Sequence, residues 1–203
     1  MDLQHPANAR KSKDFRYLKK ILTDAEIEFV RDSGNPDRAL WSLWACKETA
    51  YKAISKSYAG LSFLPRLWPV TLNQRGGMFD EGKVVISASF TVFFKLFFSE
   101  DYVHCIGSIN LYDLDKIIWD IESLQELTPD KNLEPSSLVR ESLLSRLAGI
   151  YQLNFPAMEV RRIKKDGQLQ PPYLFYENKK MPFDISLSHD GQYAAYAFIS
   201  QRG

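Results

Sequence analysis

The sequence predicts an α+β fold of two similar lobes, a pseudo-duplication in which each lobe has a helix followed by antiparallel strands. Apolar residues at helical spacing, followed by runs of β-branched and aromatic residues, occur first in the N-terminal part and again in the C-terminal part. A chain of 203 residues, 45% of them hydrophobic, can bury the cores of two small lobes. A stretch dense in turn residues begins at residue 128, so we expect lobes of 1–127 and 128–203.

The first lobe is predicted to open with helices. Thr23 and Glu26 have the spacing of a capping box, which indicates the start of one helix. The turn-forming stretch 33–37 predicts a break before a second helix over 41–56. The residues of this second helix that recur at helical spacing and should face the core are Leu43, Cys46, Ala50 and Ile54.

Three charged residues, Lys47, Glu48 and Lys52, belong to this second helix. Glu48 lies about 140° around the helix from Leu43, on the exposed side, and Lys52 follows on the same side. A Glu–Lys pair at this spacing is commonly a solvated surface pair that stabilises a helix by about 0.2–0.5 kcal/mol. Lys47 borders the apolar stripe, where its stem can pack while its ammonium reaches water. A surface pair and a ligand site both remain open.

The remainder of the first lobe is predicted to contain strands and one more helix. The β-rich segments 83–97 and 102–111 are separated by a short turn and favour a hairpin or meander. The segment 113–127 has apolar residues at helical spacing, which predicts a helix.

The second lobe repeats the order of helix and strands. A helix is predicted over 137–153, with Val139, Leu143, Leu147 and Ile150 on one face. Paired strands are expected over 158–176 around Asp166-Gly167, and over 183–199 around a polar turn at 188–191. This turn contains Ser188 and His189, but a lone Ser-His pair has little specificity because nucleophilic catalysis also needs an orienting acid.

Charge and cysteine content exclude several classes of protein. A formal net charge of +1 provides no bulk attraction to nucleic acid or to anionic lipid, so we expect neither partner. The most apolar run, 90–98, is too short to span a membrane, and residues 1–15 lack the apolar core of a signal peptide. Cys46 and Cys105 lie far apart without metal-ligand spacing, which favours a reduced, cytoplasmic protein.

Two stretches together resemble the signatures of the 4′-phosphopantetheinyl transferase superfamily. WSLWACKETAYK, residues 41–52, is similar to W-S-x-x-x-x-K-E-x-x-x-K. DISLSHDGQYAAYAF, residues 184–198, is similar to the family's strand with S-x-S-H and its following aromatic-Ala strand. In the two-lobed members the Ser-His half comes first, so this chain resembles a permuted two-lobed enzyme. In the short holo-acyl-carrier-protein synthases the Ser-His strand is also C-terminal, but those chains are smaller and trimerise. With both lobes in one chain, we expect a monomer.

The resemblance implies Mg²⁺-dependent transfer of 4′-phosphopantetheine from coenzyme A to a serine of an apo acyl or peptidyl carrier protein, in a cleft between the lobes. It assigns Glu48 to Mg²⁺ binding and to deprotonation of the serine, and Lys52 to stabilisation of phosphate charge. The residues implied in coenzyme A binding are Lys47, Arg140, Ser188 and His189. The family's Gly-Lys-Pro corresponds to Gln170-Pro171-Pro172, which lacks the lysine.

The family's metal site also takes an aspartate from an early strand. One alignment makes Asp2 this metal ligand. The alignment that we prefer matches Met1–Leu3 to the end of the strand pattern and places the ligand upstream of Met1. Since a single carboxylate holds Mg²⁺ poorly, we expect weak or no transferase activity from the chain as it stands. The alternatives are a non-catalytic protein that binds coenzyme A or a related nucleotide, and an interaction module that docks an acyl-carrier helix.

Overall fold

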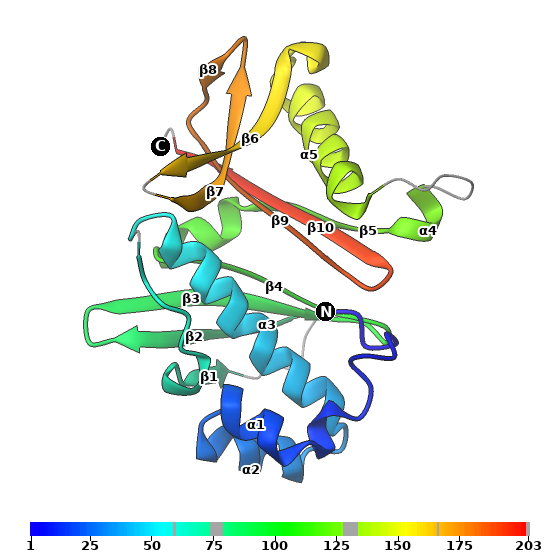
Figure 1. Cartoon of the computed structure of the whole chain (residues 1–203), viewed down its shortest axis with the longest axis vertical. Helices are drawn as coiled ribbons and strands as arrows, with labels where there is room; N and C mark the ends of the chain where they lie inside the picture. The colour runs from blue at the N-terminus through cyan, green and yellow to red at the C-terminus, as the bar shows by residue number, and fades with distance from the viewer. Residues whose placement is uncertain (59, 74–78, 128–133, 166, 202–203) are drawn as a thin grey trace. The chain divides into compact units, whose positions relative to one another are not determined.

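The computed structural model describes residues 1–58, 60–73, 79–127, 134–165 and 167–201. The chain divides into two compact units, Met1–Asp115 and Lys116–Gly203 (Figure 1). This division precedes the predicted boundary at 127/128, because residues 118–123 pair with a strand of the second unit. The fold is α+β, with helices and antiparallel sheets in both halves, as the sequence predicted.

Helices precede the sheet in the first unit. The helical segments are η1 (Lys11–Lys13), α1 (Phe15–Ile21), α2 (Asp24–Asp32), α3 (Pro36–Ser55), η2 (Pro65–Leu67) and, after the sheet, η3 (Leu111–Lys116). The strands form an antiparallel meander in chain order and are β1 (Val70–Asn73), β2 (Phe79–Ser87), β3 (Phe90–Phe98) and β4 (Val103–Ser108). The predicted meander over 83–111 is therefore confirmed, whereas β1 had no counterpart in the sequence analysis.

Local signals account for the helix starts. The predicted capping box is formed, since Glu26 N donates to Thr23 Oγ1 at 3.2 Å and Thr23 N donates to Glu26 Oε2 at 2.8 Å. Asn35 caps α3 through its side chain, and Pro36 occupies the first turn, where its missing N–H costs nothing. The residues predicted to form the core face of α3 are all buried, and they are Leu43, Cys46, Ala50 and Ile54.

Helix α3 packs closely against β4 (Figure 1). Thr49 Oγ1 donates a hydrogen bond to Cys105 O at 3.1 Å. A Cβ atom on Gly107 would lie 2.8 Å from Thr49 Cγ2 and 2.9 Å from Phe93 O, which is too close for any side chain. Glycine at this position therefore permits the approach of the helix to the strand.

The first residues of the chain pair with the start of β4. Val103 N donates to Met1 O at 3.0 Å, and the N-terminal ammonium of Met1 donates to Val103 O at 2.8 Å. Leu3 N donates to Asp101 O at 2.7 Å. These bonds anchor the N-terminal segment as an antiparallel extension at the edge of the sheet.

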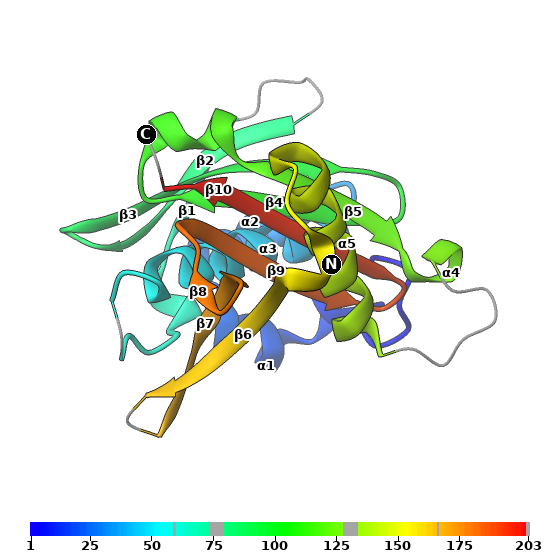
Figure 2. The same ribbon diagram turned by 90° about the horizontal axis from the view of Figure 1, so that it is seen from above.

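The second unit contains two sheets, ordered β5-β10-β9 and β6-β7-β8 within the described residues. Strands β5, β10 and β9 lie side by side in both views (Figure 1, Figure 2). The elements are β5 (Ile118–Ser123), α4 (Leu124–Leu127), α5 (Pro135–Tyr151), η4 (Phe155–Ala157), β6 (Met158–Lys165), β7 (Gln168–Tyr176), β8 (Lys179–Lys180), β9 (Phe183–Asp190) and β10 (Tyr193–Ser200). None of the helices in the described part of the chain combines the length and apolar composition needed to cross a bilayer.

The predicted helix over 113–127 is wrong. Residues 118–123 form β5 and pair antiparallel with β10, with Ile121 opposite Ala195. The apolar residues of this segment have helical spacing, but its β-branched residues also favour a strand. The strand forms because β10 provides hydrogen-bond partners for the backbone of β5. Only the short η3 and α4 remain helical at its ends.

The other predictions for the second unit are largely confirmed. Helix α5 runs over 135–151 and buries Val139, Leu143 and Leu147. Ile150 is the exception, with 41% of its surface exposed in the last turn of the helix. Strands β6 and β7 pair as predicted, while Asp166 of the predicted turn and residues 128–133 of the predicted boundary lie outside the described residues.

Candidate functional site

Glu48 and Lys52 lie on one face of α3, four residues apart. Both side chains are half-buried, so the predicted exposed side of the helix is partly covered at these two residues. Among the residues that the structure describes, neither side chain forms a hydrogen bond or an ion pair, so the surface pair expected from their spacing is not made. Two opposite charges on the same helix face are therefore available to a ligand.

Lys47 has a different position from its neighbour. Its side chain is 0% exposed. Its Nζ donates to Glu26 Oε2 at 2.6 Å and also to two backbone carbonyl oxygens, of Pro65 at 2.7 Å and of Ile21 at 3.1 Å. Burial lowers the pKa of Lys47, and the Glu26 carboxylate opposes this shift. All three ammonium donors are used inside the unit, so Lys47 has a structural role here and none of its donors is left for the phosphate contact that the resemblance implied.

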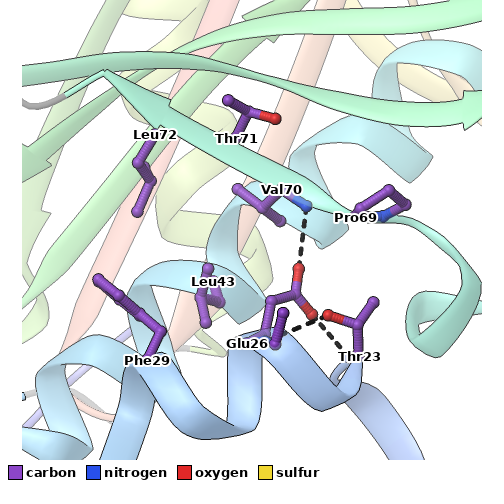
Figure 3. Close-up of a pocket in the computed structure, with 9 residues that line it drawn as sticks. Thr23, Glu26, Phe29, Leu43, Pro69, Val70, Thr71 and Leu72 are labelled. Carbon is purple, nitrogen blue, oxygen red and sulfur yellow. Dashed lines mark hydrogen bonds between the residues drawn. The ribbon is translucent and has the colours of Figure 1, made fainter. Parts of the chain in front are cut away.

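The carboxylate of Glu26 also connects the start of α2 to the start of β1 (Figure 3). Its Oε1 accepts a hydrogen bond from Val70 N at 2.9 Å, at the start of β1, and its Oε2 accepts from Thr23 N. The capping box identified Glu26 in the sequence, but the pairing with Lys47 carried no sequence signal. The pair joins the start of α2, the start of β1 and the middle of α3.

A pocket of about 520 Å³ lies between α2 and β1 (Figure 3). Its wall is mainly apolar, and the lining residues are Thr23, Ala25, Glu26, Phe29, Leu43, Pro69, Val70, Thr71 and Leu72. None of the residues predicted for the site lines this pocket. Its Glu26 carboxylate is already bonded to Lys47, Thr23 and Val70.

The carboxylate of Asp2 holds the turn that follows the N-terminal segment. Asp2 is 2% exposed, and its Oδ1 accepts hydrogen bonds from Gln4 N at 2.8 Å and His5 N at 3.1 Å. Asn8 Nδ2 donates to Asp2 O at 2.8 Å. A buried carboxylate that bonds two following backbone N–H groups has the geometry of a turn-forming aspartate.

Lys52 contributes to the electrostatics around β4. Burial, together with the charges of the N-terminal ammonium and of Lys52, lowers the pKa of His104 to about 3. Burial also raises the pKa of Tyr17, on α1, and the charge of Glu48 adds to this increase. His104 is therefore neutral at physiological pH, beside a positive region formed by Lys52 and the N-terminus.

The second unit contains Ser188, His189 and Arg140. Ser188 and His189 lie in β9, opposite Ala195 and Ala194, so the prediction that they form the turn is wrong. The connection to β10 is instead made by residues 191–192, since the strand pairing continues to Asp190. His189 and Arg140 are exposed and Ser188 is half-buried. Their side chains form no hydrogen bond or ion pair with another described residue.

A family model for the 4′-phosphopantetheinyl transferase superfamily matches residues 1–106, which is more than half of the chain. This chain belongs to the 4′-phosphopantetheinyl transferase superfamily. The match lies within the first unit and includes Asp2, Lys47, Glu48 and Lys52. No curated protein and no solved structure matches the chain.

Members of this transferase superfamily typically use Mg²⁺ with coenzyme A. The described residues contain no group of three or more His, Cys, Asp or Glu side chains that could hold a metal ion. Mg²⁺ is commonly held by one or two carboxylates together with substrate phosphates, so a large protein cage is not required. The half-buried Glu48 fits this mode of binding, because its carboxylate has no partner among the described residues. Asp2 fits it less well, because its Oδ1 bonds the following backbone.

We expect Asp2→Asn to leave both stability and transferase activity close to wild type. Asparagine retains the Oδ1 acceptor for Gln4 N and His5 N but removes the negative charge that a metal ligand would need. Asp2→Ala, the matched variant without an acceptor, should lose about 1–3 kcal/mol of unfolding free energy. Urea unfolding and a carrier-modification assay measure the two effects. Loss of Mg²⁺-dependent transfer in a fully stable Asp2→Asn protein would instead identify Asp2 as a metal ligand.

The low pKa of His104 predicts a loss of stability in acid. With a folded-state pKa of about 3 and an unfolded value of 6.5, the unfolded state binds more protons between these values, so stability falls as the pH decreases from 6.5 towards 3. When the pH is lowered from 7 to 5, the wild type should lose about 2 kcal/mol more unfolding free energy than His104→Leu, which has no titrating ring. Urea unfolding at both pH values tests this. Equal losses in the two proteins would contradict the lowered pKa of His104.

Proposed function

We propose that this chain transfers the 4′-phosphopantetheine group from coenzyme A to a serine of an apo acyl or peptidyl carrier protein. Membership of the superfamily supports the reaction class. The observation that carries the proposal is that Glu48 and Lys52 share a helix face but form no ion pair with each other. If the two residues only stabilised the helix, we would expect them to form an ion pair at this spacing.

Each of the two residues has a role that fits its chemistry. In the reaction the serine oxygen attacks a phosphorus atom of the coenzyme A pyrophosphate, and the nucleotide phosphate leaves. Glu48 would accept the serine proton, since an ionised carboxylate can act as a general base. Lys52 would stabilise the negative charge that develops on the phosphate oxygens. Mg²⁺, held by Glu48 together with substrate phosphates, would neutralise pyrophosphate charge.

The second unit would contribute contacts to coenzyme A. We assign these contacts to Ser188 and His189 on the basis of the family resemblance of β9 and β10, and to Arg140 on the basis of its place in helix α5, where the family often has a basic contact to the nucleotide. The exposure of His189 and Arg140 supports this assignment, because an exposed imidazole or guanidinium can bind phosphate without losing an internal bond. With both units in one chain, we propose that the protein acts as a monomer.

The direct test is to incubate the full chain with coenzyme A, Mg²⁺ and an apo carrier protein, and then to weigh the carrier by mass spectrometry. We expect the carrier to gain one phosphopantetheine group, at a low rate, because of the two carboxylates assigned to Mg²⁺ only Glu48 lacks a bond to a described residue. A chelator should prevent the gain, and a carrier with its acceptor serine changed to alanine should remain unmodified. An unchanged mass across carriers of fatty acid, polyketide and peptide assembly would contradict transferase activity.

A second candidate is a homologue that binds coenzyme A without transferring its pantetheine. The turn-forming bonds of Asp2 favour it, because of the two carboxylates that the resemblance assigns to Mg²⁺ they leave only Glu48 without a bond to a described residue. Calorimetry with coenzyme A separates the possibilities. Binding without modification of any carrier would indicate this homologue, whereas carrier binding without coenzyme A binding would indicate an interaction module.

A further inference from the structure

Cys46 and Cys105 are far apart in sequence but adjacent in the fold. Cys46 lies on α3 and Cys105 on β4, 59 residues later, and their Sγ atoms are 3.9 Å apart. Both are reduced thiols in the structure. Cys46 is completely buried, while Cys105 is half-buried. The pair thus combines an inner thiol with one that is partly accessible from outside.

The surrounding packing holds the two thiols together. The hydrogen bond from Thr49 Oγ1 to Cys105 O joins the helix to the strand beside the pair. Gly107, two residues further along β4, allows this close approach. A disulfide requires an Sγ–Sγ distance of about 2.05 Å, so the sulfur atoms need to approach by about 2 Å.

We propose that Cys46 and Cys105 are a redox modification site, at which a peroxide converts the two thiols into a reversible intramolecular disulfide. The proposal does not depend on the transferase function. No sequence spacing indicates it, because the two residues are brought together only by the packing of α3 on β4.

The order of the chemical steps follows from burial. Cys105, the more accessible thiol, loses its proton, and its sulfur attacks one oxygen of hydrogen peroxide. The O–O bond breaks, a sulfenic acid forms, and the leaving hydroxide takes up that proton to give water. Cys46 is completely buried and therefore shielded from peroxide in solution, so it acts second. Its sulfur attacks the sulfenic sulfur, the S–O bond breaks, and water leaves with the Cys46 proton. The two thiols lose two electrons and two protons, and a dithiol reductant reverses the reaction by exchange.

The disulfide would join α3 to β4 close to Glu48, which follows Cys46 by two residues. It would also close a long loop in the unfolded chain, and this lowers the entropy of the unfolded state. We therefore expect the unfolding midpoint of the oxidised protein to rise by about 5 °C or more, and to return to the starting value after reduction.

The test is to treat the full chain, at low concentration, with hydrogen peroxide, to unfold it in an excess of a thiol-alkylating reagent, and to measure its intact mass. We expect a monomer lighter by two hydrogens, without alkyl groups, and a proteolytic fragment in which the Cys46 and Cys105 peptides are joined. The untreated protein should take up two alkyl groups. A small free thiol, treated in parallel, shows when the peroxide treatment is sufficient for full oxidation. If both cysteines of the protein can still be alkylated after that treatment, the proposal is overturned.

Matched variants separate the role of each thiol. Cys46→Ala preserves an apolar core at this position, and its remaining Cys105 should stop at the sulfenic acid or a more oxidised acid. In Cys105→Ser the buried Cys46 should remain reduced under the same treatment. Circular dichroism establishes that each variant is folded. If Cys105→Ser were oxidised as readily as the wild type, the assigned order of attack would be wrong and the proposal would fail.

Discussion

Glu48→Gln is expected to lower the rate of carrier modification by about 100-fold or more while leaving the protein folded. Glutamine has nearly the same shape, but it can neither accept the serine proton nor supply negative charge to Mg²⁺. The side chain is half-buried and has no partner among the described residues, so unfolding free energy should change by less than about 0.5 kcal/mol. The measurements are kcat from the mass of the carrier and the midpoint of urea unfolding.

Glu28→Gln is the matched control for this variant. Glu28 is an exposed residue of α2 in the same unit, so its substitution makes the same change in net charge without affecting the face of Glu48 and Lys52. We expect its activity to equal that of the wild type. If the Glu48→Gln protein is folded and fully active, Glu48 and Lys52 are surface charges without a catalytic role.

Lys47→Met should produce the largest loss of stability, about 3–5 kcal/mol of unfolding free energy. Methionine can occupy the buried space, but it leaves the Glu26 carboxylate without its cation and the carbonyl oxygens of Ile21 and Pro65 without a donor. The cost is large because a buried charge that has lost its partner is not solvated by water. Tryptophan fluorescence follows unfolding of the first unit, where Trp41, Trp44 and Trp68 lie.

A double-mutant cycle with Glu26→Gln separates the ion pair from simple loss of packing. Removing both charges should cost less than the sum of the two single changes, because neither partner is then left ionised and buried. Additive losses would show that the two side chains act independently. Lys52 is a half-buried lysine on the same helix, without an ion-pair partner among the described residues. The variant Lys52→Met should therefore lose less than about 1 kcal/mol of unfolding free energy.

Much of the first unit could be predicted because its signals are local. The capping box of Thr23 and Glu26 involves residues within one helical turn, and the buried stripe of α3 depends only on helical spacing. The common face of Glu48 and Lys52 follows from the same spacing. The neighbouring elements decide how far these two side chains are buried, and the helical spacing could not indicate that both are half-buried.

The errors concern segments whose state depends on a distant partner. Residues 118–123 contain helical spacing, but they form a strand because β10, far along the chain, offers a continuous row of hydrogen bonds. Ser188 and His189 were predicted in a turn, whereas the pairing of β9 with β10 extends through both residues. A short turn motif does not indicate how far the flanking strands continue.

The sequence by itself determined the α+β class, the helix starts and the helix that carries Glu48 and Lys52, together with the superfamily that this helix indicates. These features depend on residues within a few positions of one another, where propensity and periodicity act directly. The tertiary structure decided that Lys47 is a buried partner of Glu26, that Asp2 holds a turn, and that Cys46 lies beside Cys105. Such contacts join residues far apart in the chain, and the packing of α3 against α2 and β4 brings them together only when the unit has folded.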